Sequence, residues 1–107
     1  MSGPVTGIEG WNTMPNTDAH YVLRLFVAGA SPNSVRAIAN IRAICAQHLE
    51  GRHTLEIIDV RKNAAAAQRE QIIALPLLIK DSPAPARRLI GDMSDTLRVL
   101  RGLGLAE

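Results

Sequence analysis

The apolar run from Tyr21 to Ala28 constrains the fold of this chain more than any other feature of its sequence. Arg24 is the one residue that interrupts it. Such a run is typical of a strand buried on both faces, because a half-buried strand would alternate apolar and polar residues. It therefore predicts an α/β domain in which a sheet has other elements packed against both of its faces.

A long helix is predicted directly after this strand. Ser31 and Pro32 are typical of a helix start, because the hydroxyl accepts an orphan backbone N–H and proline needs none at the first position. Gly51 is expected to cap the far end. Between them, apolar residues recur at helical spacing and predict the buried side of the helix: Val35, Ile38, Ile41, Cys45 and Leu49.

The second half of the chain predicts two more helices and three more strands. A strand is expected from Thr54 to Val60, followed by an alanine-rich helix from Ala64 to about Ala74. Strands at Leu77–Lys80 and Arg87–Ile90 flank a proline-containing turn. Asn63 is the expected cap of the alanine-rich helix, and the apolar residues of that helix come late, at Ile72 and Ile73.

A last helix is expected after Gly91, with Asp92 or Ser94 as its cap. Its apolar side is formed by Leu97, Leu100 and Leu103.

The resulting order, β-α-β-α-β-β-α, predicts a four-stranded mixed sheet with helices on both faces. This is the thioredoxin-like arrangement. Thioredoxin-like proteins place a cis proline at the start of the third strand, and Pro76 opens that strand here. We therefore expect a cis peptide bond between Leu75 and Pro76.

The chain divides into a flexible N-terminal extension, residues 1–20, and a folded domain, residues 21–107. Four of the first ten residues are Gly or Pro, so the extension is expected to be flexible, and docking through Trp11 is the less favoured alternative. The extension has no Lys or Arg and no long apolar segment, so it does not resemble a signal peptide. No apolar stretch approaches the roughly 20 residues that span a bilayer. We therefore expect a cytoplasmic protein with no membrane partner.

Charge and aromatic content argue against nucleic-acid binding. The formal net charge is +2, and from Tyr21 onward 12 basic residues minus 8 acidic ones give +4. Nucleic-acid-binding proteins combine a dense basic stripe with aromatic side chains that stack on bases. The aromatic residues here are only Trp11, Tyr21 and Phe26.

Thiol–disulfide chemistry is the enzymatic activity that a thioredoxin-like fold suggests first. It needs two cysteines, two residues apart, at the start of the first helix, where the helix dipole lowers the pKa of the attacking thiol. Ser31 and Ser34 stand at those positions, and the single cysteine, Cys45, falls on the apolar side of the helix. His20, His48 and His53 lack the spacing of a metal site. We expect no enzyme activity, no cofactor and no metal.

Four segments resemble the KaiB family of bacterial clock proteins. They are YVLRLFVAGASPNSVRAI (21–38), IIDVRKN (57–63), ALP (74–76) and RRLIGDMS (87–94). The resemblance extends from Tyr21 to Leu103 almost without gaps. It implies a non-enzymatic protein that binds the N-terminal ring of KaiC, a hexameric ATPase and autokinase, and modulates its phosphorylation state in a circadian clock or a stress-linked timer.

The resemblance also implies further partners and a second fold. KaiB-like proteins help to sequester KaiA and act on signalling through histidine kinases. Their chains adopt either a thioredoxin-like monomer or a rearranged ground state that forms dimers and tetramers, and two such packings differ by only a few kcal/mol. An alternative reading is a KaiB-like sensor module of a SasA-type histidine kinase pathway.

The residues to which the resemblance assigns roles fall into two sets. The residues expected to bind a partner are Arg36, Glu56, Gln71, Lys80 and Arg88. The residues expected to determine the fold, including the choice between the two folds, are Tyr21, Pro76, Gly102 and Gly104. Cyanobacterial relatives usually have Lys in place of Glu56 and Gln71, so an unchanged acidic partner would meet an electrostatic mismatch. Gly104 replaces the family's Asp, and the family's usual aromatic and acidic tail is absent. Both differences favour the thioredoxin-like form. Gly102 and Tyr21, in contrast, match the pattern of the rearranged ground state.

Overall fold

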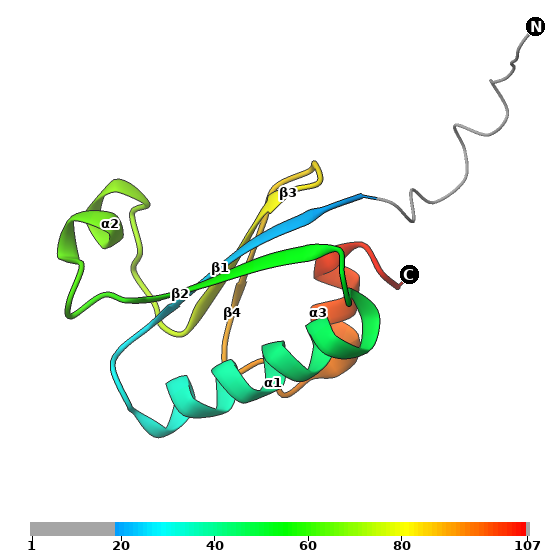
Figure 1. Ribbon diagram of the computed structural model, residues 1–107. Coiled ribbons are helices and arrows are strands. Elements are labelled where there is room, and N and C mark those ends of the chain that lie inside the picture. The colour runs from blue at the N-terminus through cyan, green and yellow to red at the C-terminus, as the bar shows by residue number, and fades with distance from the viewer. Residues whose placement is uncertain (1–18, 107) are drawn as a thin grey trace, which may run out of the picture.

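The computed structural model describes residues 19–106 of the chain, so most of the predicted N-terminal extension lies outside the described residues. The elements follow the predicted order (Figure 1). They are β1 (Tyr21–Val27), α1 (Pro32–His48), β2 (His53–Asp59), α2 (Ala64–Arg69), β3 (Leu77–Ser82), β4 (Arg87–Ile90) and α3 (Thr96–Leu103).

The four strands form one mixed sheet in the order β2-β1-β3-β4. β1 is parallel to β2 and antiparallel to β3, and β4 is antiparallel to β3. Phe26 of β1 lies opposite Ile58 on one side and Leu77 on the other. β1 is therefore an interior strand, which explains why its apolar run is nearly continuous.

Helices cover both faces of the sheet, as predicted, but unequally. α1 and α3 lie on one side, where they enclose the larger core with Leu23 and Leu25 of β1 (Figure 1). α2 contributes Ala66 to a smaller cluster with Phe26 and Ile79 on the opposite face. Because α2 has only six residues, the second face is less completely covered than the first.

Each of the three helices begins with a side chain that accepts a backbone N–H, and two of the three predicted caps are correct. The side chain of Ser31 accepts a hydrogen bond from the N–H of Ser34, and that of Asn63 accepts one from the N–H of Ala66, so both predicted caps are confirmed. α3 is capped by Asp95, not by Asp92 or Ser94 as expected. Asp92 instead binds the N–H of Ser94 in the preceding turn.

The predicted buried sides of α1 and α3 are confirmed except at one residue on each helix. Val35 on α1 and Leu97 on α3 were expected in the core, but they are 52% and 50% exposed. In α3 the buried side chains are those of Val99 and Leu103. Leu49, not Gly51, caps α1 at its C-terminal end. Apolar residues on both sides of a helix leave its rotation ambiguous, and packing against the sheet decides it.

α2 ends at Arg69, five residues earlier than the predicted boundary at Ala74. Gln71 adopts a left-handed conformation with φ 55°. Its N–H donates to Gln68 O, and the N–H of Ile72 donates to Ala67 O, a pair of hydrogen bonds that satisfies the last carbonyls of a helix and stops it. Ile72 packs against the smaller cluster, whereas Ile73 is 95% exposed.

The residues expected to set the fold cluster around α3 and the start of β3. The Tyr21 hydroxyl donates to the carbonyl oxygen of Leu103 at 2.9 Å. Gly102 faces Leu89 so closely that a Cβ would lie 2.6 Å from its Cδ1 atom, and Gly104 ends α3 with φ 78°. The Leu75–Pro76 peptide bond is cis, as expected, and the bonds preceding Pro83 and Pro85 are also cis.

Candidate functional site

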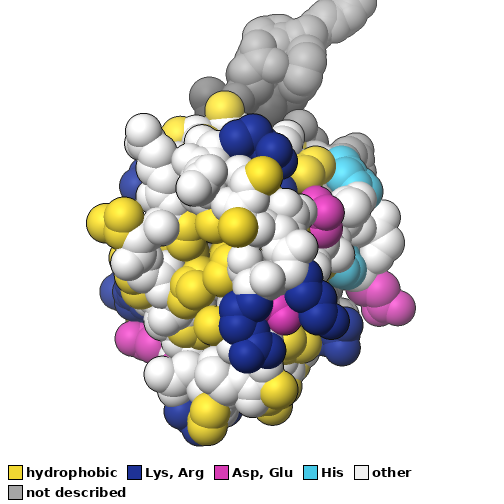
Figure 2. All heavy atoms as spheres, turned by 90° about the vertical axis from the view of Figure 1, so that its left-hand side faces the viewer, with side chains coloured by type: hydrophobic (Ala, Val, Ile, Leu, Met, Phe, Trp, Pro, Cys, Tyr) yellow, Lys and Arg dark blue, Asp and Glu magenta, His cyan; other side chains and the backbone are white. Residues whose placement is uncertain are grey.

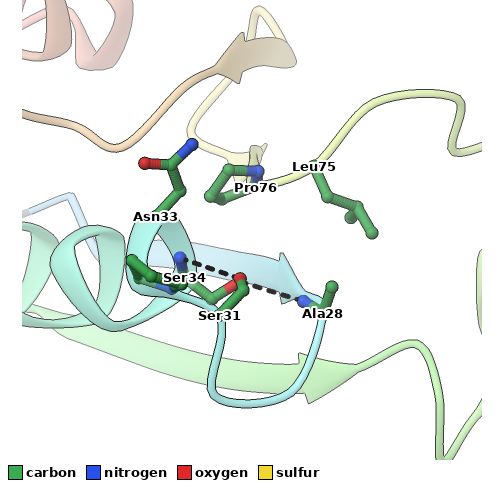
Figure 3. Close-up of a pocket in the computed structure, with 7 residues that line it drawn as sticks. Ala28, Ser31, Asn33, Ser34, Leu75 and Pro76 are labelled. Atoms are coloured by element: carbon green, nitrogen blue, oxygen red, sulfur yellow. Dashed lines mark hydrogen bonds between the residues drawn. The ribbon is translucent and has the colours of Figure 1, made fainter.

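The position of a thioredoxin's thiols is occupied by a hydroxyl network (Figure 3). Ser34 is fully buried, its Oγ accepts the N–H of Ala28 at 3.0 Å, and it lies 2.8 Å from the Oγ of Ser31. A pocket of about 260 Å³ opens beside this network, against Leu75 and Pro76. Both hydroxyls therefore hold the turn between β1 and α1, and neither can form a disulfide.

Cys45 lies about three helical turns further along α1. Its side chain is buried, and burial raises the pKa of its thiol to about 11. The thiol is therefore protonated at neutral pH and shielded from solvent. The structure gives this cysteine the role of a small core side chain, as the sequence predicted.

This placement predicts a cysteine with almost no reactivity. At pH 8 we expect dithiobis(nitrobenzoate) to modify Cys45 at least about two orders of magnitude more slowly in the folded protein than in guanidinium, because both thiolate formation and access are suppressed. We expect no insulin reduction under any condition. Rapid modification of the native protein, or reductase activity that Cys45→Ala abolishes, would contradict this assignment.

The carboxylates at the strand ends also serve turns. Asp59 Oδ1 accepts the N–H groups of Gly29 and Arg61, at 3.1 and 3.0 Å. Hydrogen bonds from Arg61 and Ser94 lower the pKa values of Asp59 and Asp92, respectively. Within residues 19–106 no group of three or more His, Cys, Asp or Glu side chains is placed to hold a metal ion, and no helix there is long and apolar enough to span a bilayer.

Two of the expected partner-binding residues meet at one end of the sheet. Gln71 and Arg88 line an apolar hollow of about 180 Å³ together with Ile73, Leu77 and Ile90. Figure 2 looks onto this end of the molecule and shows hydrophobic side chains gathered near its centre, with Lys and Arg side chains beside and below them. We call this surface the apolar hollow. Its exposed isoleucines distinguish it from an ordinary charged surface.

Arg36 and Glu56 are also exposed, but they lie apart from the hollow. Arg36 is on α1, where it binds Asn33 and forms an ion pair with Asp92 at 3.2 Å. Glu56 is on the edge strand β2, opposite Arg24 in the register. Of the five expected partner-binding residues, the hollow therefore contains two, and Arg36 and Glu56 lie on other elements, α1 and the opposite edge strand.

Lys80 is the exception, because it is only 4% exposed. It alternates with Ile79 along β3 and so shares the face of Leu78, toward the larger core. Burial, and then the nearby charge of Arg87, lowers the pKa of its ammonium group. The structure therefore turns the Lys80 side chain away from the solvent-exposed surface on which the other four expected partner-binding residues lie.

A network of ion pairs, not foreseen from the sequence, joins α2 to the sheet. Arg24 binds both oxygens of Asp81, at 2.6 and 2.8 Å, and Glu70 Oε2 at 2.7 Å. Arg88 donates to the carbonyl oxygen of Glu70 at 2.7 Å. Arg87, its neighbour, is exposed and makes no ion pair or hydrogen bond with any residue between 19 and 106. The network fixes the end of α2 beside the hollow.

Comparison with known proteins decides the family. The model of the KaiB domain matches residues 24–105. This chain belongs to the KaiB family. Two relatives named circadian clock oscillator protein KaiB, from Gloeothece citriformis and a Nostoc species, are 48% and 49% identical over 85 residues. Those residues are 79% of this chain and 80% and 79% of the two relatives.

Solved structures support the thioredoxin-like fold of this KaiB-family chain. The N-terminal domain of Synechococcus elongatus SasA superposes with a TM-score of 0.65 at 21% identity, covering 100% of this chain and 96% of that domain. A thioredoxin from Fasciola hepatica gives 0.64 at 17% identity, covering 80% and 84%. The fold is therefore thioredoxin-like, and with a single cysteine it lacks the paired thiols.

Proposed function

We propose that this KaiB-family chain is a non-enzymatic, cytoplasmic regulator that binds a KaiC-like hexameric ATPase and autokinase and modulates its phosphorylation state, in a circadian or stress-linked timing system. Two observations support this proposal: the chain belongs to a clock-protein family, and it has serines where a thioredoxin has its two reactive cysteines. The observation that carries the proposal is the apolar hollow, where Gln71 and Arg88 flank Ile73. Because Ile73 is 95% exposed, burial of its side chain by a partner would lower the free energy of the complex.

Size-exclusion chromatography of the whole chain tests this function. We expect the protein to co-elute with the KaiC-like ATPase of its own organism at micromolar concentrations in the presence of nucleotide. Arg88→Ala should weaken the complex, whereas Arg42→Ala, on the exposed side of α1, should leave it unchanged. Failure of the parent protein to co-elute under every nucleotide condition would reject the proposal.

Glu56 provides a sharper probe, because the family resemblance implies a lysine at this position in cyanobacterial relatives. If the partner has adapted to this carboxylate, Glu56→Lys should weaken binding to the protein's own KaiC and strengthen binding to a cyanobacterial one. We expect changes of about 1 kcal/mol, the scale for a mismatched charge at an interface rim. Isothermal titration calorimetry with both partners measures this.

The matched control for Glu56 is Glu50→Lys, an equal charge change at an exposed residue outside β2. It should change neither affinity beyond the general effect of net charge. Equal responses of the two variants, or no response of either partner to Glu56→Lys, would place Glu56 outside the contact.

A second candidate role is favoured by the similarity to the SasA domain, which extends over the whole chain. In it, the chain is a KaiB-like interaction module of a SasA-type histidine kinase pathway. The two roles differ in what the protein needs for binding. Binding to a histidine kinase without the ATPase present would favour the module, and a requirement for the ATPase would favour the regulator.

Self-association and the choice between two folds belong to the same proposal. We propose that the thioredoxin-like form predominates, because Gly104 stands where the resemblance implies an aspartate that helps to hold the rearranged fold. KaiA is a further expected partner in a complete clock. Chromatography of the protein alone distinguishes a monomer from the dimers and tetramers of the rearranged fold.

A further inference from the structure

β2 forms one edge of the sheet, and no strand of residues 19–106 lies beside its outer side. The N–H of Tyr21 in β1 donates to the carbonyl oxygen of Arg52 at 2.7 Å. The pairing of β1 with β2 continues from there without a bulge. Because backbone groups alternate in direction along a strand, the even-numbered residues of β2 point to β1 and the odd-numbered ones point outward. The outward residues before the last one of β2 are His53, Leu55 and Ile57.

These outward backbone groups are unpaired. The N–H and C=O groups of His53, Leu55 and Ile57 make no hydrogen bond with any residue between 19 and 106. At the next outward residue, Asp59, the carbonyl oxygen already accepts two N–H groups of the following turn, both at 3.0 Å. A strand edge with free donors and acceptors is a template for pairing with another strand. The available part of this edge therefore extends from His53 to Ile57.

We propose that the β2 edge of a second copy of this chain pairs with this edge, antiparallel, about a two-fold axis through Leu55. Outward groups can bond only to outward groups, so the axis of such a pairing passes through residue 54, 55 or 56. With the axis through Leu55, that residue faces its own copy, and His53 faces Ile57 of the second copy. This pairing forms about six backbone hydrogen bonds, because each hydrogen-bonded pair of residues exchanges two.

The two other positions of the axis fit less well. An axis through Thr54 places Ile57 opposite Gly51, which lies before the strand and has φ 76°. An axis through Glu56 brings the Glu56 carboxylates of the two copies face to face, and like charges directly opposite each other destabilise a pair of strands. The charge of Glu56 therefore selects the axis through Leu55.

The side chains on both faces of β2 suit this pairing. Thr54 and Glu56 are exposed, and Thr54 lies opposite Glu56 of the second copy, with Cα atoms about 4.5 Å apart. The hydroxyl of Thr54 is 2.8 Å from His20 Nε2; when His20 donates to it, the hydroxyl proton is free for the carboxylate. On the α1 face, Leu55 and Ile57 are only partly buried, so the second copy has apolar surface to cover.

Pairing of two copies would cover Glu56, one of the residues expected to bind a partner. The second copy and a partner at Glu56 would then compete, and this consequence alone rests on the proposed function. The pairing itself involves no other protein and is tested without one.

Amide hydrogen exchange of the whole chain, measured by NMR at several protein concentrations, tests the pairing. We expect the amides of Leu55 and Ile57 to gain protection as the concentration rises, because only the second copy binds them. The amides of Thr54 and Glu56 bind β1 and should be protected at every concentration. Sedimentation velocity measures the dimer fraction, which should become large at high micromolar concentrations, as is typical of a small, transient interface.

Charge variants test the position of the axis. Thr54→Glu places a second carboxylate opposite Glu56 in both symmetric pairs and should weaken the dimer about tenfold. Thr54→Gln, the matched neutral control, should change the affinity less than about threefold. Thr54→Glu combined with Glu56→Lys puts opposite charges face to face and should return dimerisation at least to the level of the parent protein.

Three results would overturn the proposal. The first is a protein that stays monomeric at millimolar concentration. The second is a dimer in which Leu55 and Ile57 gain no protection, which would assign self-association to another surface or to the rearranged fold. The third is an equal response to Thr54→Glu and Thr54→Gln, or a double variant that fails to dimerise. Circular dichroism checks that each variant is folded, and Thr54 and Glu56 are both exposed in the monomer.

Discussion

Leu103→Ala is expected to lower the free energy of unfolding by about 3 kcal/mol, the largest effect of any single truncation on α3. The Leu103 side chain is fully buried between α3 and the sheet. Its removal forfeits the transfer free energy of the lost methyl groups and leaves a cavity that the surrounding core fills only in part. Urea denaturation followed by circular dichroism measures the change.

Leu97→Ala is the matched control, since it makes the same truncation on the same helix. Leu97 is half exposed, so its loss should cost less than about 0.5 kcal/mol. The comparison tests the rotation of α3, which the sequence alone assigned with Leu97 in the core. Similar costs for the two variants would mean that α3 packs in a different phase.

Arg24→Ala is expected to cost about 2 kcal/mol, because it leaves Glu70 and Asp81 facing each other across a half-buried site without their shared cation. It also removes the guanidinium group from the ring of Phe26, 5.6 Å away. Arg36→Ala is the control. Arg36 pairs with one carboxylate on a well-exposed surface, so its loss should cost less than about 1 kcal/mol.

The loss of unfolding free energy caused by Arg24→Ala should depend on pH. Its hydrogen bond to Glu70 holds the pKa of that carboxyl below the usual range. A carboxyl whose pKa is lower in the folded state contributes stability above its unfolded pKa, near 4.3, and loses it as the pH falls through the folded value. The difference between the parent and Arg24→Ala should therefore shrink between about pH 6 and about pH 3. A difference independent of pH would show that packing on Phe26 dominates.

Local features of the sequence predicted most of the fold because they depend on neighbouring residues. The caps at Ser31 and Asn63 require a side-chain oxygen three residues before an N–H, a relation that the sequence displays directly. Element order follows from periodicity in the same way. The boundary of α2 was missed because Gln71 adopts a left-handed conformation that glycine, not glutamine, usually signals.

The candidate site was less predictable because it depends on side chains brought together from separate elements. Gln71 and Arg88 meet in one hollow although they are 17 positions apart in the sequence. Resemblance selected both residues but gave no hint of the exposed Ile73 between them. It also selected Lys80, which strand alternation turns toward the core.

The sequence by itself determined the strands and helices, their order, the serines in place of thiols and the family to which the chain belongs. These properties follow from residue identity and short-range spacing. The tertiary structure alone decided that Leu97 of α3 lies outside the core, that Arg24 binds two carboxylates 46 and 57 residues away, and that one face of β3 and β4 stays open. Each of these depends on how elements pack against the sheet, and packing is set by the whole core at once rather than by any one segment.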